Sequence, residues 1–169
     1  MRNTNRKNIH KLALLSILTS AALILSYVEA VIPPIVSAVP GIKLGFPNIL
    51  IIYILYRMGI WEAIAVSFVR IMLGFVLFGT PLSFVYSVAG AILSLAIMVI
   101  LKKTDLLSTV GVSVAGAVFH NLGQILMAML LLGTTAVGYY LIILSITGTI
   151  AGIFIGLCGA LMIKRLIVY

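Results

Sequence analysis

Long apolar runs separated by short breaks make up most of this chain. A helix of about 20 apolar residues is long enough to cross the hydrocarbon core of a bilayer. The runs predict helical spans at residues 12–32, 46–57, 62–79, 82–101, 106–132 and 136–163. The second run is the shortest, so it predicts a thin or tilted span. We therefore expect an all-α integral membrane bundle of six helices, built as a single domain over residues 1–169.

The breaks between the runs carry turn and capping signals. Pro33 and Pro34 end the first run, and the segment that they open, residues 33–45, is apolar but too rich in proline and glycine for a helix. We expect this segment to fold over the protein as a lid. Thr80 is placed as an N-cap and Pro81 as the first residue of the next helix.

Composition and charge fix the environment and the orientation. The chain is 63% hydrophobic and 8% charged, whereas soluble domains are about 25% charged. The net charge of +8 comes from cations that flank the apolar runs, which indicates contact with lipid head groups rather than with nucleic acid. Under the positive-inside rule both termini lie in the cytoplasm of a cell-membrane protein. The cations assigned to that side are Arg2, Arg6, Lys7, Lys11, Arg57, Lys102, Lys103, Lys164 and Arg165.

One cation, Arg70, lies inside the third run. An arginine at the centre of a membrane helix costs about 2.5–3.5 kcal/mol on insertion scales, and Arg70 would lie roughly 12 Å from the cytoplasmic end. Two interpretations remain open. Arg70 pairs with a buried partner, for which Glu29 is the first acidic candidate, or it lines a cavity and meets an anionic or carbonyl-bearing ligand.

Further polar residues extend the candidate site. His120, Asn121 and Gln124 share one broad face of a helix, which must point at the bundle interior. They serve either as interhelical hydrogen-bonding groups or as groups that orient a ligand. Lys43 and Asn48 flank the external loop, where Lys43 either closes over an anionic solute or is solvated.

Two tyrosines and several small residues complete the candidates. Tyr27 and Tyr86 either stack on a planar ligand or are ordinary core and interface aromatics. Small residues spaced by four form ridges that let another helix approach closely. In the last run the ridge predicts packing inside the bundle, whereas on the first run an exposed ridge would be a docking surface. These positions are Gly148, Gly152, Gly156 and Ala160 in the last run, and Ser16 and Ser20 in the first.

Several chemistries lack the residues they need. The chain has no phosphate-binding GxxxxGK[ST] loop, and its one aspartate, Asp105, cannot form an aspartate-rich magnesium site. A lone Cys158 and a lone intramembrane histidine do not make a metal site. We therefore expect no metal, no cofactor and no catalytic residue, and the sequence assigns no enzymatic activity.

Four segments resemble a known family. The segments YVEAVIPPI, PGIKLGFPNI, VRIMLGFVLFGTP and FHNLGQ resemble the small membrane proteins called Gx transporters, also called heptaprenyl diphosphate synthase component I. The six-helix layout is similar to that of the S components of energy-coupling factor transporters. This resemblance implies a solute-binding subunit that works with a membrane coupling subunit and ATPases. S components often carry a small-xxx-small pattern on helix one, where this chain has Ser16 and Ser20.

The expected function follows from these observations. The leading hypothesis is a membrane subunit that binds a small vitamin- or precursor-like solute, anionic or polar aromatic, from the outer side. The alternative is an accessory membrane subunit of isoprenoid or quinone biosynthesis, or of a flavin-linked redox chain. The expected binding residues are Arg70, His120, Asn121, Gln124, Lys43, Asn48, Glu29, Tyr27 and Tyr86.

Overall fold

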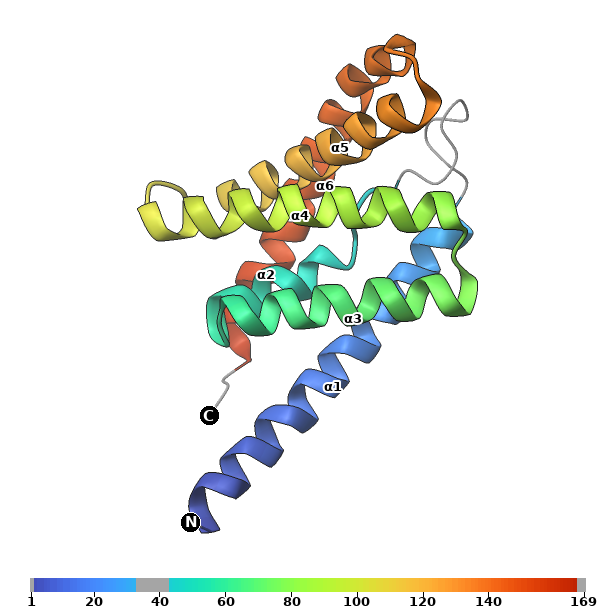
Figure 1. Cartoon of the computed structure of the whole chain (residues 1–169). Helices are drawn as coiled ribbons and strands as arrows, with labels where there is room; N and C mark the ends of the chain where they lie inside the picture. The colour runs from blue at the N-terminus through green and yellow to red at the C-terminus, as the bar shows by residue number, and fades with distance from the viewer. Residues whose placement is uncertain (1, 33–42, 167–169) are drawn as a thin grey trace.

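The computed structural model describes residues 2–32 and 43–166, and this part of the chain is helical without strands (Figure 1). Within these residues, five helices are long and apolar enough to cross a membrane, and one further apolar helix, α2, is shorter. The protein is therefore an all-α membrane-embedded bundle. In order, the elements are α1 (Arg2–Val31), α2 (Asn48–Arg57), α3 (Ile60–Phe78), α4 (Pro81–Thr104), α5 (Thr109–Leu132), the 3₁₀ turn η1 (Ala136–Tyr139) and α6 (Tyr140–Arg165).

Two helices, α1 and α5, begin at residues other than the expected ones. Helix α1 begins at Arg2 rather than at residue 12, because no proline or glycine interrupts residues 2–32 and the polar start continues the helix. Helix α5 begins at Thr109 rather than at residue 106, where the Ser108 side chain caps it by accepting the Gly111 N–H. The expected cap at Thr80 is confirmed, since its hydroxyl accepts the Ser83 N–H at 3.2 Å.

The short helix α2 lies in the core of the bundle. It has ten residues and is therefore about 15 Å long, half of the roughly 30 Å hydrocarbon core. Residues 50–55 are all buried, against α6 and α3. At its C-terminal end Lys102 donates to the Leu55 carbonyl at 2.6 Å, and Arg57 donates to the Ile163 carbonyl of α6. These bonds tie the cation-rich ends of α2, α4 and α6 together.

Helices α4, α5 and α6 pack closely on one another. The glycine ridge of α6 packs inside the bundle, as the sequence predicted, and it faces α5. A Cβ atom on Gly152 would lie 2.7 Å from the Cα of Val114, and one on Gly156 would lie 2.7 Å from the Cα of Val110. Because backbone lies at both positions, larger side chains do not fit without moving a helix.

Candidate functional site

A group of buried polar side chains lies inside the apolar bundle. Such groups are costly at membrane depth and mark functional sites more often than chance. They come from α1 to α5, so the polar interior is shared by most of the helices. The members are Ser26, Glu29, Asn48, Ser67, Arg70, Ser83, Ser94, Ser113, His120, Asn121 and Gln124.

Arg70 is only 6% exposed and is poorly satisfied. Its two terminal nitrogens make long hydrogen bonds, at 3.5 Å to the Ser26 hydroxyl and at 3.4 Å to the Asn48 side-chain oxygen. Its Nε has no partner within the described part of the chain. A guanidinium carries five N–H donors, so most of its hydrogen-bonding capacity is unused.

Glu29 does not form a direct ion pair with Arg70. The described residues hold no salt bridge within 4.0 Å between them, although the two charges are near enough to attract each other. The Glu29 carboxylate instead accepts the backbone N–H of Gly45. Of the two interpretations of Arg70, a structural ion pair is therefore the less well supported.

Lys43 is held in place from α5. Its backbone N–H donates to the Gln124 Oε1 at 2.8 Å, and its carbonyl accepts from the Gln124 Nε2 at 2.9 Å. Together with the bond from Gly45 to Glu29, this fixes residues 43–45, which we call the strap, between α1 and α5. Lys43 is half-buried rather than fully solvated, and burial lowers the pKa of its ammonium group, an effect that the Glu29 carboxylate partly offsets.

The expected lid covers residues 33–45. Residues 33–42 lie outside the described residues, so only the strap is seen of it.

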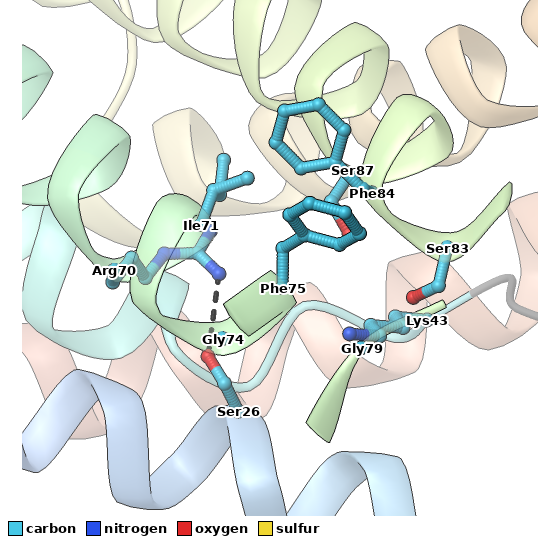
Figure 2. Close-up of a pocket in the computed structure, with 10 residues that line it drawn as sticks. All are labelled: Ser26, Lys43, Arg70, Ile71, Gly74, Phe75, Gly79, Ser83, Phe84 and Ser87. Carbon is cyan, nitrogen blue, oxygen red and sulfur yellow. Dashed lines mark hydrogen bonds between the residues drawn. The ribbon is translucent and has the colours of Figure 1, made fainter. Parts of the chain in front are cut away.

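Arg70 and Lys43 line the same small cavity, shown in Figure 2. Its volume of about 20 Å³ is close to that of a single ordered water. The remaining lining residues are three serines, two phenylalanines and three further residues: Ser26, Ser83, Ser87, Phe75, Phe84, Ile71, Gly74 and Gly79. A vitamin-sized solute would need a site of about 300–1,000 Å³, so only a small polar group fits without rearrangement.

The three polar residues of α5 are buried, but none of them lines this cavity. Gln124 holds the strap. Asn121 donates to the Leu144 carbonyl of α6 at 2.6 Å, which is the packing role that the sequence left open. His120 lies against α4, where a Cβ on Gly90 would be 2.8 Å from its Nδ1, and that nitrogen has no partner within the described part of the chain.

The two tyrosines lie apart from the cavity. Tyr27 is 54% exposed, and its ring packs edge-on against Phe78 with a centroid distance of 5.4 Å. Tyr86 is fully buried in an apolar cluster with Ile125 and Leu144. Of the residues expected from the sequence, Arg70 and Lys43 thus line the cavity, and Asn48, Glu29 and Gln124 contact one of them or the strap.

The serines and phenylalanines of the cavity were not among the binding residues predicted from the sequence. Ser83 and Ser87 are one helical turn apart on α4, and Phe75 and Phe84 flank the turn between α3 and α4. Their ring centroids are 4.8 Å apart. The available signal was that two hydroxyls recur at helical spacing directly after the Thr80 cap, across a tight turn from Arg70.

A second, larger hollow lies on the surface between α1 and α3. Its volume is about 410 Å³, and Ser16 and Ser20 are exposed along it. Both hydroxyls donate to carbonyls of their own helix at 3.0 Å, so the groove is apolar in character. The other lining residues are Leu12, Leu15, Thr19, Ala65, Val66, Val69 and Leu73.

Comparison with known families identifies one match. The family model described as heptaprenyl diphosphate synthase component I matches residues 18–162. Comparison with curated proteins and comparison with solved structures each found no match. Among residues 2–32 and 43–166, no three His, Cys, Asp or Glu side chains are grouped as metal ligands.

Proposed function

Starting from a chain that belongs to the heptaprenyl diphosphate synthase component I family, we propose that it is the solute-binding membrane subunit of a transporter of the energy-coupling factor type. The single observation that carries this proposal is the cavity lined by Arg70, a buried cation with most of its donors unused. A purely structural arginine would be expected to have close partners. In this proposal, the bound solute supplies the close hydrogen-bond partners that Arg70 lacks.

The proposal includes a topology. Helix α2 is the sixth span, completed on the outer side by the strap, and both termini are cytoplasmic in the cell membrane. Two observations support this topology. The cations Arg57 and Lys102 lie together at one end of the bundle, through their bonds to α6 and α2, whereas Lys43 lies at the cavity near the turn between α3 and α4.

A partner subunit is part of the proposal. We place its docking surface on the groove between α1 and α3, where Ser16 and Ser20 are exposed. Small side chains on a lipid-facing groove let a second membrane helix approach closely. The ATP-hydrolysing subunits would be separate chains, because this one has no phosphate-binding loop.

The second candidate function is an accessory subunit in the synthesis of a prenyl diphosphate. The family description favours it, since it names a component of a heptaprenyl diphosphate synthase. The chain has only three acidic residues, so it would present or move a precursor rather than supply the magnesium ligands of the reaction. Co-purification of a soluble prenyl synthase, without any ATPase module, would favour this candidate.

Mass spectrometry of small molecules released from the purified full-length protein tests the leading proposal. We expect the wild type and the control Ser113→Ala, a buried serine outside the cavity, to retain the same solute, and Arg70→Ala to lose it. A wild-type protein that retains only lipid contradicts the proposal. So does an Arg70→Ala protein that equals the wild type in both solute affinity and thermal stability.

A further inference from the structure

We propose that the cavity binds a single anionic group, a carboxylate or a phosphate, between Arg70 and Lys43. This inference rests on the proposed function and specifies the chemical class of its solute. It depends on a count of charges, on the donors that line the cavity, and on the aromatic rings beside it (Figure 2).

The first step is the charge balance around the cavity. Arg70 and Lys43 both line it, and Glu29 is the acidic residue that attracts both of them. Glu29 also accepts the Gly45 N–H, so part of its hydrogen-bonding capacity is already used. Two cations beside one carboxylate leave an excess positive charge in a site that is largely removed from water, which is unfavourable unless an anion compensates it. One negative charge on the ligand restores neutrality.

The second step is the set of hydrogen-bond donors. The Nε of Arg70 has no partner in the described structure, and its two terminal nitrogens reach their acceptors only at 3.4 and 3.5 Å. Ser83 and Ser87 line the same space and each carry a hydroxyl, whereas the Ser26 hydroxyl already donates to the Ala22 carbonyl of its own helix. A planar guanidinium with adjacent N–H and O–H donors matches the oxygens of a carboxylate or a phosphate, whereas a cationic group would meet no free acceptor of comparable strength.

The third step is the shape of the site. A volume of about 20 Å³ accommodates a head group and not a whole solute. Phe75 and Phe84 form an apolar wall beside it, with ring planes tilted by 34°. The rest of the solute would therefore pack against these rings, and a flat apolar body suits them best. Benzoate combines both features in the smallest available probe.

Binding of benzoate to the purified full-length protein in detergent tests the inference, with benzamide as the neutral probe of the same shape. We expect benzoate to bind at least about tenfold more tightly than benzamide. Arg70→Gln and Lys43→Gln should each weaken benzoate binding about tenfold, and the exposed control Lys103→Gln should leave it unchanged. Because Lys43 lies outside the helices, its variant tests the site even if Arg70→Gln fails to fold.

Competition experiments separate the two sources of the anion. The first experiment uses nanodiscs. If phosphatidylglycerol displaces benzoate and phosphatidylcholine does not, the anion is identified as a lipid head group. Displacement of benzoate by inorganic phosphate or acetate alone would identify it as a soluble solute. Either result supports an anion site at Arg70 and Lys43.

Two results would overturn the inference. In the first, benzamide binds as tightly as benzoate, or a neutral solute co-purifies and depends on Arg70; the proposed solute-binding function would then stand without its anionic class. In the second, benzoate binding is unchanged in both Arg70→Gln and Lys43→Gln. If instead no solute co-purifies with the protein and neither benzoate nor benzamide binds to it, the proposed function itself is rejected.

Discussion

Gln124 of α5 hydrogen-bonds both backbone groups of Lys43, accepting its N–H at 2.8 Å and donating to its carbonyl at 2.9 Å. A buried amide on one helix thereby sets the position of a cation on a non-helical segment far away in the sequence. Gln124 does not line the cavity. We therefore assign it as a positioning residue that acts through Lys43.

The first prediction concerns this positioning role. Gln124→Leu keeps the size of the side chain but removes both hydrogen bonds, so benzoate affinity should fall several-fold. In a Lys43→Gln background the same change should add little, because the residue that it positions is already neutral. A double-mutant cycle of dissociation constants measures this coupling. Equal effects of Gln124→Leu in both backgrounds would contradict it.

The second prediction separates stability from binding at Arg70. Removing one partner of a buried ion pair destabilises a protein when it leaves the other charge uncompensated, but Arg70→Met leaves Lys43 beside Glu29 to balance its charge. Because Arg70 has only long hydrogen bonds, Arg70→Met should unfold at the same temperature as the wild type or higher, while the stabilisation by benzoate disappears. Thermal unfolding with and without benzoate measures both effects. A large loss of stability without ligand would indicate a structural role.

The third prediction concerns pH. Burial lowers the pKa of Lys43 from its ordinary value, and the ammonium is charged only below that pKa. Benzoate affinity should therefore be full at lower pH and fall as pH rises through the lowered pKa, in the range below the ordinary lysine pKa of about 10.4. Titration of binding across this range measures the loss. Lys43→Arg, which stays charged, should give a flat profile, and a flat wild-type profile would contradict the assignment.

The fourth prediction concerns the packing of α5 on α6. Gly152→Val places a side chain 2.7 Å from backbone of α5, and overpacking of this kind typically costs about 1–3 kcal/mol. The variant should unfold at a lower temperature than the wild type. Ala13→Val, at an exposed position of α1, is the control that introduces the same valine side chain at the surface. Equal stability of the two variants would argue against close contact along the ridge.

The fifth prediction concerns the groove between α1 and α3. Leucine at Ser16 and Ser20 would fill the groove, so the double variant should no longer co-purify with a membrane coupling subunit. Benzoate binding should be unchanged, since neither serine lines the cavity. Ile24→Ala, an exposed change on the same helix, should retain the partner. Normal assembly of the double variant would reject this docking surface.

The lengths of the apolar runs and the turn and capping residues between them allowed the helices to be predicted. They did not allow the contacts between the helices to be predicted. The Thr80 cap and the intramembrane Arg70 were visible because proline, threonine and arginine are distinctive in an apolar chain. The buried face of each helix was not, because in a membrane the outer face is apolar as well. Tyr27 and Tyr86 therefore looked alike in the sequence, although one is exposed and the other is fully buried.

The same difficulty affected the candidate site. His120, Asn121 and Gln124 share a broad arc of α5, yet each contacts a different neighbour: α4, α6 and the strap. The packing of the other helices around α5 decides which neighbour each of these three residues meets. The long-range bonds of the strap to Glu29 and Gln124 leave no local pattern in the sequence, so they could not be predicted from it.

Helix α2 is only ten residues long, and non-helical backbone that includes the strap precedes it. Peptide groups outside a helix need other hydrogen-bond partners where they are removed from water. Glu29 and Gln124 take that place for the N–H groups of Gly45 and Lys43 and for the Lys43 carbonyl. Each of these hydrogen bonds is worth about 1 kcal/mol. The position of the Lys43 cation is therefore set by side chains of α1 and α5 rather than by a helix of its own.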